Sequence, residues 1–206
     1  MTLQIIECEQ GTPEWFQARL GIPTASEFST VMAKGEGKTR KAYMLKLAGE
    51  ILTGEPAESF KSAAMERGTV MEDEARDAYC FLKNVEVRRV GFIRNGLTGC
   101  SPDSLVGDDG GLEVKSAAAH IQIDRLIKND IPPEHKAQVQ GSIWITDRDW
   151  WDFTSYGGAK LPPLIVRVRR DNGYIANMKG EVDRFNDELA ALVETIRKYG
   201  VEAKAA

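Results

Sequence analysis

Hydrophobic residues recur along this chain with two different periods, and these periods predict an alternation of helices and strands. Residues 13–33 mix apolar and polar positions around Ser26, which has the residue type of a helix N-cap and is followed by an acidic residue. Residues 40–52 form an amphipathic pattern that ends before a glycine and a proline. Residues 62–83 repeat apolar positions at intervals of three and four. These patterns predict two helices in the first 83 residues.

The middle of the chain is typical of strands, and the remainder alternates between both kinds of element. Apolar runs bounded by turn residues predict strands over residues 85–94, 97–106 and 111–117. The later pattern predicts helices over 120–129 and 134–146, strands over 150–156 and 164–170, and a long closing helix over 174–199. This order predicts an α/β fold in which a mixed sheet is flanked by helices.

Composition narrows the class of protein. The 206 residues, 42% of them hydrophobic and 28% charged, suffice for one well-packed domain. The chain has neither a long apolar run nor a leader-like N-terminus, so we expect no membrane insertion and a cytoplasmic protein. Three widely spaced cysteines, Cys8, Cys80 and Cys100, favour a reduced compartment over a disulfide framework or a zinc site. With only His120 and His135 present, a Ser-His-Asp triad is difficult to build.

Charge is distributed unevenly along the chain. A net charge of −4 argues against a protein that coats nucleic acid along its whole surface, because neutralising phosphate requires basic residues. Residues 34–46 nevertheless contain five basic residues and a single acid. That composition is typical of a local anion-facing patch, and a solvated helix face explains it equally well.

The candidate chemistry is concentrated in two adjacent strand-like runs. Asp103 lies in the first run, Glu113 and Lys115 lie in the second, and the turn 107–111 joins them. Side chains two residues apart on a strand point to the same side, so Glu113 and Lys115 project together while Val114 faces the core. The Val114 carbonyl then lies beside the two side chains as a further oxygen ligand. Such hard oxygen ligands suit Mg²⁺, and a neighbouring lysine suits phosphodiester hydrolysis. A hairpin with solvent-facing charges explains these residues equally well.

Two predicted helices carry further polar candidates. Glu72 lies beside the apolar stripe of the 62–83 helix, where a partly buried carboxylate costs free energy unless it is paired or bound to a metal. Gln138 and Gln140 lie on the 134–146 helix, where a glutamine can orient a nucleophilic water or a phosphate. The polar face of an ordinary helix explains these glutamines equally well.

Five ordered sequence blocks resemble a known nuclease family. Through these blocks the chain resembles the PD-(D/E)xK nuclease superfamily and, more narrowly, the phage lambda exonuclease (YqaJ-type) family of viral alkaline exonucleases. The similarity runs from about Trp15 to the closing helix. The blocks are Arg19-Leu20-Gly21 with Thr24-Ala25-Ser26-Glu27, Met71-Glu72-Asp73-Glu74-Ala75-Arg76, Cys100-Ser101-Pro102-Asp103, Leu112-Glu113-Val114-Lys115, and Ala137-Gln138-Val139-Gln140 before Trp144.

The resemblance implies a restriction-endonuclease-like core within a single nuclease domain over residues 1–206. Residues 1–60 would form a helical part with a 5′-phosphate pocket. Residues 61–170 would form the PD-(D/E)xK core, and residues 171–206 the C-terminal helix.

The resemblance also implies a metal centre. Asp103, Glu113 and the carbonyl of Val114 would bind the catalytic Mg²⁺. Glu72 would help to bind a second ion, so that two Mg²⁺ are expected, with Mn²⁺ as a substitute.

Roles for the remaining candidates follow from the same resemblance. Lys115 would activate or position the attacking water and stabilise the transition state. Gln140 would assist the nucleophile, with Gln138 as the alternative.

A pocket for the terminal 5′-phosphate is implied as well. Arg19 and Ser26 would hold this phosphate, in agreement with the bidentate grip of arginine on phosphate. A further basic residue is expected after this region, with Lys38 and Lys34 as rival candidates.

The family resemblance implies an activity for the whole chain. The expected protein is a Mg²⁺-dependent, processive 5′→3′ exonuclease that releases 5′-mononucleotides from double-stranded DNA ends with a 5′-phosphate. It would leave a 3′ single-stranded overhang for homologous recombination and work with a single-strand annealing protein (recombinase). We expect a homotrimer ring encoded by a phage or prophage and acting in the cytoplasm of a bacterial host. A ring would reconcile the acidic chain with DNA, because only the bore need be positive.

Two other functions are compatible with the same residues. One is a structure-specific or single-strand DNA nuclease of the same superfamily. The other is a non-catalytic DNA-binding recombination accessory protein. The presence of Asp103, Glu113 and Lys115 argues against this second alternative.

Overall fold

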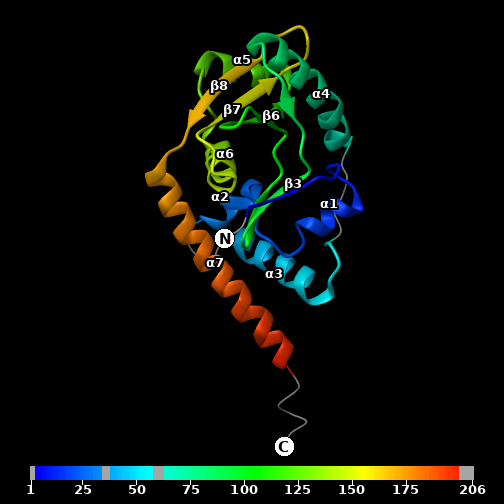
Figure 1. Cartoon of the computed structure of the whole chain (residues 1–206), viewed down its shortest axis with the longest axis vertical. Helices are drawn as coiled ribbons and strands as arrows, with labels where there is room; N and C mark the ends of the chain where they lie inside the picture. Colours follow the sequence, from blue (N-terminus) through cyan, green and yellow to red (C-terminus); the bar gives the residue numbers. More distant parts are fainter. Residues whose placement is uncertain (1–2, 34–37, 58–62, 200–206) are drawn as a thin grey trace, which may run out of the picture.

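Two sheets organise the chain in the computed structural model, which describes residues 3–33, 38–57 and 63–199 (Figure 1). Among these residues the smaller sheet is antiparallel with strand order β1-β3-β4. The larger sheet has the order β2-β5-β6-β7-β8 and is mixed, because β6 and β7 run parallel and its other pairs run antiparallel. The strands are β1 Leu3–Ile6, β2 Val87–Arg88, β3 Phe92–Asn95, β4 Thr98–Cys100, β5 Ser104–Val106, β6 Gly110–Ser116, β7 Trp150–Tyr156 and β8 Leu164–Arg169.

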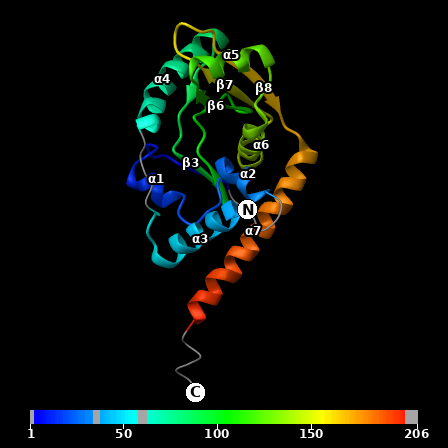
Figure 2. The same ribbon diagram turned by 180° about the vertical axis from the view of Figure 1, so that it is seen from behind.

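Helices cover both faces of the larger sheet, with α4 on one face and α6 on the other (Figures 1 and 2). On the first face Tyr79 of α4 packs with Val114, and on the second Ile143 of α6 packs with Phe153. The α/β fold expected from the sequence, a mixed sheet flanked by helices, is confirmed. The helices are α1 Pro13–Ala18, the 3-10 helix η1 Ala25–Glu27, α2 Phe28–Val31, α3 Lys38–Thr53, α4 Ala63–Lys83, α5 Ala119–Lys128, α6 Pro133–Thr146 and α7 Asn172–Lys198.

Two of the predicted strands are wrong, because each run divides between the two sheets. The run 85–94 forms β2 in the larger sheet and β3 in the smaller one, and the run 97–106 forms β4 and β5 in the same way. The first break contains Gly91, where a Cβ atom would lie 2.3 Å from the Cys8 carbonyl oxygen, so only glycine admits that backbone. The second contains Pro102, which lacks a donor for a strand ladder. Asp103 therefore immediately precedes β5.

The expected helix cap at Ser26 is also wrong. Ser26 is an exposed residue inside η1, and Thr24 is the residue that precedes this short helix. A Cβ on Gly141 of α6 would lie 2.5 Å from the ring of Phe28 in α2, so glycine permits close packing of α6 against this region. The Ser26 segment lies beside α6 and beside β4 of the smaller sheet.

The closing helix α7 begins two residues before the predicted start. Asp171 caps it by accepting a hydrogen bond from the Tyr174 N–H at 2.9 Å. Figure 1 shows α7 extending well beyond the sheets, with α3 beside part of its length. No helix among the described residues is long and apolar enough to cross a membrane.

Candidate active site

Asp103 and Glu113 are neighbours across the β5–β6 hairpin. The antiparallel register pairs Ser104 with Leu112, so Asp103, one residue before Ser104, lies opposite Glu113, one residue after Leu112. Asp103 Oδ2 accepts a hydrogen bond of 2.5 Å from the backbone N–H of Val114. This bond holds the Asp103 carboxylate against the strand that carries Glu113.

Glu113 is almost completely buried and has two polar partners. Its Oε1 lies 2.6 Å from Nζ of Lys115 and also accepts a 2.6 Å hydrogen bond from Nε2 of Gln138 on α6. The Glu113 side chain is 3% exposed, whereas Lys115 is 31% exposed and faces the adjoining cavity. A buried carboxylate with two such donors is fixed in one orientation.

The ammonium of Lys115 keeps its proton in this arrangement. Burial alone lowers the pKa of Lys115, but the ion pair with Glu113 and the charge of Asp103 outweigh it and raise the pKa above its usual value. Lys115 is therefore better suited to stabilising negative charge than to removing a proton.

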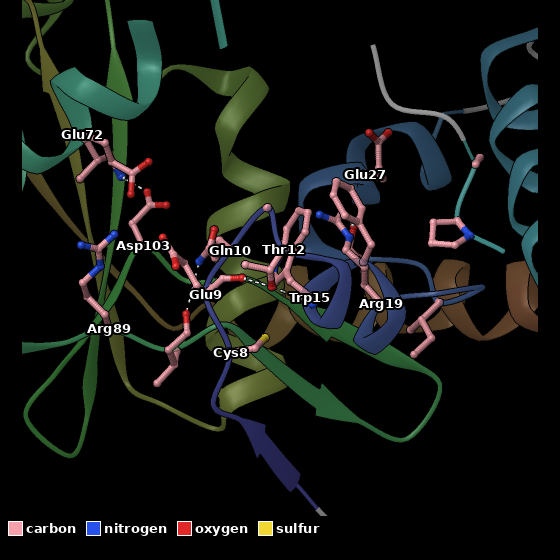
Figure 3. A pocket seen from close by; sticks show the side chains of 18 of the residues that line it. Cys8, Glu9, Gln10, Thr12, Trp15, Arg19, Glu27, Glu72, Arg89 and Asp103 are labelled. Carbon is pink, nitrogen blue, oxygen red and sulfur yellow. Dashed lines mark hydrogen bonds between the residues drawn. The ribbon is translucent and has the colours of Figure 1, made fainter. Parts of the chain in front are cut away.

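Three carboxylates share this region of the molecule. Burial raises the pKa of Asp103 well above its usual value, and the nearby charges of Glu113 and Glu72 raise it further. Burial also raises the pKa of Glu72, against the opposing charge of Arg76. Figure 3 shows the carboxylates of Glu72 and Asp103 pointing toward one another. Like charges brought together in this way are stabilised by a cation.

The donor set fits a hard divalent ion such as Mg²⁺, because carboxylate and carbonyl oxygens are its preferred protein ligands. Val114 packs against α4 through its side chain, in agreement with the expected orientation of this residue. No group of three or more His, Cys, Asp or Glu side chains is spaced as a formed metal site in the described ranges. Glu113 pairs with Lys115 through Oε1, and Glu72 pairs with Arg76 through Oε1, so the second oxygen of each carboxylate is left for an ion.

The two glutamines of α6 point in different directions, and the expected preference for Gln140 is reversed. Gln140 donates to the Arg169 carbonyl at 2.8 Å and accepts from the Asp171 N–H at 3.0 Å, which places it at the junction of β8 and α7. Gln138 is the glutamine that contacts Glu113. Two residues along a helix differ by about 200° in direction, so both side chains cannot face one site.

Substitution of the two glutamines separates their roles. We expect Gln138→Ala to lower the activity per folded molecule by roughly 10- to 100-fold, because it releases a carboxylate of the metal centre. Gln140→Ala should cost about 1–3 kcal/mol of unfolding free energy, because two partly buried backbone groups lose the partner that joins α6 to the β8–α7 junction, while activity per folded molecule is retained. Thermal unfolding and initial rates measured on both variants check this; equal activity losses would contradict it.

A second group of residues surrounds Arg19. Its guanidinium lies 4.1 Å from the centre of the Trp15 ring, and its Nη2 approaches Oγ1 of Thr24 at 3.5 Å. Thr24 Oγ1 lies 3.1 Å from the Ser26 hydroxyl, and the Thr24 N–H donates to the Tyr43 hydroxyl at 3.2 Å. Burial lowers the pKa of Arg19 from its usual value. Within the described residues, no carboxylate lies at ion-pair distance from this half-buried cation.

One small cavity joins the two groups. Its volume is about 160 Å³. A larger cleft of about 1390 Å³ adjoins it, and Figure 3 shows Glu72 and Asp103 at one end with Trp15 and Arg19 further along. The small cavity is lined by Arg19, Thr24, Ala25, Ser26, Cys100, Ser101, Asp103, Glu113, Lys115, Gln138 and Ser142.

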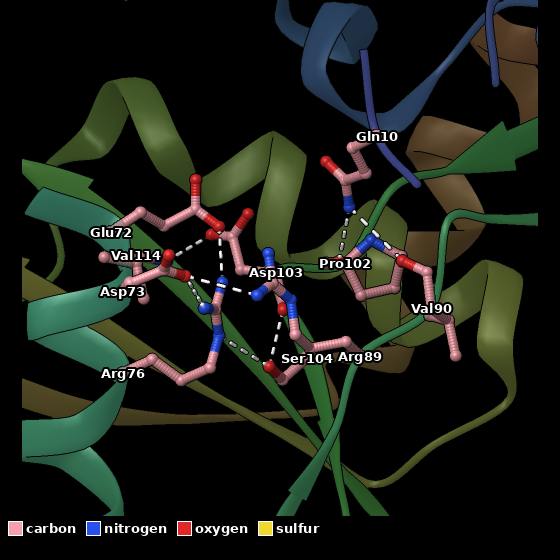
Figure 4. A network of polar contacts seen from close by, with 10 residues as sticks. All are labelled: Gln10, Glu72, Asp73, Arg76, Arg89, Val90, Pro102, Asp103, Ser104 and Val114. Atoms are coloured by element: carbon pink, nitrogen blue, oxygen red, sulfur yellow. Dashed lines mark hydrogen bonds and ion pairs between the residues drawn. The ribbon is translucent and has the colours of Figure 1, made fainter. Parts of the chain in front are cut away.

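The N-terminal segment fixes the backbone just before Asp103. Gln10 donates to the Pro102 carbonyl at 2.9 Å (Figure 4). The Trp15 indole donates to the Ser101 hydroxyl at 2.9 Å. These bonds connect the Arg19 region directly to the segment that carries Asp103.

Of the two basic residues expected to complete the phosphate pocket, the structure describes Lys38 and does not bring it to the pocket. Lys38 is exposed at the start of α3 and lines neither the small cavity nor the cleft, and Lys34 lies outside the described residues. Arg40 from the same run pairs with Glu188 of α7 at 2.7 Å. Lys46 lines the cleft instead.

Several residues at the site had no predicted role. Thr24 and Tyr43 hold the Arg19 region, and buried Glu50 accepts a 2.8 Å hydrogen bond from the Gly21 N–H. Arg76 binds Glu72. Thr24 and Arg76 fall within the sequence blocks of the family resemblance. Their place in these blocks was the sign in the sequence that they belong to the site.

The fold and the site together define a nuclease core of the PD-(D/E)xK type, with Asp103 and the Glu113-x-Lys115 pair on adjacent strands of a mixed sheet. A profile of the YqaJ-like viral recombinase domain matches residues 14–149, and the chain belongs to this family.

Solved structures agree with this assignment. The chain is similar to an alkaline exonuclease (LHK-Exo) from Laribacter hongkongensis, with 37% identity, a TM-score of 0.85, and coverage of 95% of this chain and 100% of that one. The structure of LHK-Exo in complex with dAMP matches with the same values. A phage related exonuclease from Haemophilus somnus 129PT, 14% identical, shares the fold with a TM-score of 0.65 over 85% of this chain and 96% of that one. Comparison with curated proteins gave no match.

The expectations for family, fold class and enzyme class are thereby confirmed. The chain is a deoxyribonuclease by its family and its similarity to an alkaline exonuclease.

Proposed function

We propose that this protein is a Mg²⁺-dependent, processive 5′→3′ exonuclease on double-stranded DNA that releases 5′-mononucleotides and leaves a 3′ single-stranded overhang for single-strand-annealing recombination. The observation that carries the proposal is the small cavity, which has Arg19 and Ser26 on one side and Asp103, Glu113 and Lys115 on the other. A terminal phosphate bound at the first group would leave the same strand facing the second.

The burial and the contacts of Arg19 support an anion-binding site. A half-buried guanidinium without a carboxylate partner among the described residues is costly, and a phosphate would supply the missing charge. The Thr24 and Ser26 hydroxyls lie beside it as further hydrogen-bonding groups. A phosphate site here would favour DNA ends that carry a 5′-phosphate.

The chain's own groups would divide the hydrolytic work. Mg²⁺, when bound, supplies Lewis-acid stabilisation of the phosphodiester and acidifies water. Asp103, Glu113 and the Val114 carbonyl would hold one ion, and Glu72 would contribute to a second. Protonated Lys115 would stabilise the charge that develops on the phosphate.

The product and the assembly belong to the same proposal. LHK-Exo has been solved with dAMP, which supports a site that accepts a mononucleotide. We infer a homotrimeric ring that works with a single-strand annealing protein, because a positive bore would let an acidic chain enclose DNA. Light scattering of the purified protein measures the assembly, and a monomeric mass at working concentration would contradict the ring.

Digestion of end-labelled duplex DNA tests the activity. In Mg²⁺ we expect early release of the 5′ label as a mononucleotide, faster from 5′-phosphate ends than from 5′-hydroxyl ends, and no release in EDTA. A matched single strand and a duplex labelled at the 3′ end serve as controls. Earlier release of the 3′ label, or preference for the single strand, would contradict the proposal and favour another nuclease of the superfamily.

A further inference from the structure

Arg76 of α4 is a buried guanidinium that uses all three of its nitrogen atoms. The residue is 6% exposed. Its Nη2 lies 2.5 Å from Oε1 of Glu72, its Nη1 lies 2.5 Å from Oδ1 of Asp73, and its Nε donates to Oγ of Ser104 at 3.1 Å. The planar fork of arginine reaches three partners at once, which the single ammonium of lysine in the same position cannot reproduce.

The contact with Ser104 joins α4 to the strand that follows Asp103. Ser104 is fully buried, and its hydroxyl donates to the Asp103 carbonyl at 2.5 Å while accepting from Arg76. Figure 4 shows this continuous network from Glu72 through Arg76 to Ser104 and Asp103. One side chain therefore sets the position of two candidate metal ligands that come from different elements.

The geometry at Glu72 indicates what this network does for the site. Arg76 engages Oε1 of Glu72, and the carboxylates of Glu72 and Asp103 point toward one another (Figures 3 and 4). Without a fixed partner, a glutamate on a helix would turn toward solvent, away from two neighbouring carboxylates that repel it. Arg76 retains Glu72 at the site while leaving its second oxygen for another cation.

We propose that Arg76 is a positioning residue that holds Glu72 and Asp103 in register and thereby sets the affinity of the centre for its second metal ion. This inference rests on the proposed function, because it takes the three acids as metal ligands. Partners of metal ligands tune affinity and activity by about 10- to 100-fold.

The test measures metal binding directly, without DNA. We expect Arg76→Lys to weaken the lower-affinity Mn²⁺ site by about tenfold or more in calorimetric titration of the full chain, with the stronger site less affected. The Mg²⁺ concentration for half-maximal digestion should rise in parallel, while KM for DNA ends at saturating Mg²⁺ stays unchanged. Glu72→Gln should also weaken this site, and the double variant should lose less than the sum of the two single losses, since Glu72 is one of the two ligands that Arg76 holds.

Arg184→Lys is the matched control, because Arg184 makes a surface pair with Glu181 at the same i,i+3 spacing and lies on α7. If Arg76→Lys fails to fold, Ser104→Ala removes one arm of the network while keeping the charge, and it should weaken the same site. Unchanged Mn²⁺ binding in the folded variant, or additive effects with Glu72→Gln, would overturn the inference. Absence of metal-dependent digestion by the unmodified protein would instead overturn the proposed function.

Discussion

Replacing Lys115 with alanine is expected to lower kcat by about 10²–10³-fold while affinity for DNA ends changes little. Lys115 is a protonated ammonium held by Glu113 at the edge of the cavity, so its charge is available to a phosphate whose negative charge increases during hydrolysis. An interaction that strengthens only in the transition state affects kcat far more than binding. The loss should therefore appear almost entirely in the chemical step.

Single-turnover digestion and DNA binding in Ca²⁺ separate the two quantities for this variant. Lys179→Ala is the control, because Lys179 makes an exposed pair with Asp183 on α7. Parallel loss of binding and rate in the Lys115 variant would show that this residue grips DNA and does not act in the chemical step.

Replacing Arg19 with alanine should abolish the preference for 5′-phosphorylated ends. A hydrogen bond to a charged group contributes about 1.5–3 kcal/mol, which corresponds to roughly 10- to 150-fold in KM for these ends. The rate on 5′-hydroxyl ends should change much less, because those ends lack the group that Arg19 binds. The effect is therefore a change in selectivity between two substrates that differ in one phosphate.

Competition between the two kinds of end in one reaction measures this selectivity directly. Arg197→Ala, which removes an exposed pair with Glu194, controls for the loss of one positive charge. Survival of the preference in the Arg19 variant would exclude this pocket as the determinant of polarity.

The parts of the site that depend on local periodicity were predictable from the sequence. Strand β7 has the bounds expected from its pattern, and Glu113 and Lys115 share a side of β6 as the two-residue period requires. The division of the run 97–106 between two sheets was not predictable. Its strands pair locally with β3 and β6, but the sheet that each hairpin joins depends on distant pairings with β1 and β7.

The choice between Gln138 and Gln140 failed for a different physical reason. Helix α6 is buried on almost all sides from Ala137 to Thr146, so its sequence has no exposed polar face against which to orient the two glutamines. Their directions depend on the partners that tertiary packing supplies, which are Glu113 for one and the β8–α7 junction for the other.

The bonds from Gln10 and Trp15 to the segment before Asp103 have a consequence for how the enzyme is made. They join residues 92 and 86 positions apart in the chain, and Gln138 reaches Glu113 from a helix that is synthesised later still. Contacts of such long range form late in folding, because large loops must close first. A growing polypeptide on the ribosome therefore lacks a complete active site until most of its length has emerged. The chain becomes active only when its fold is complete.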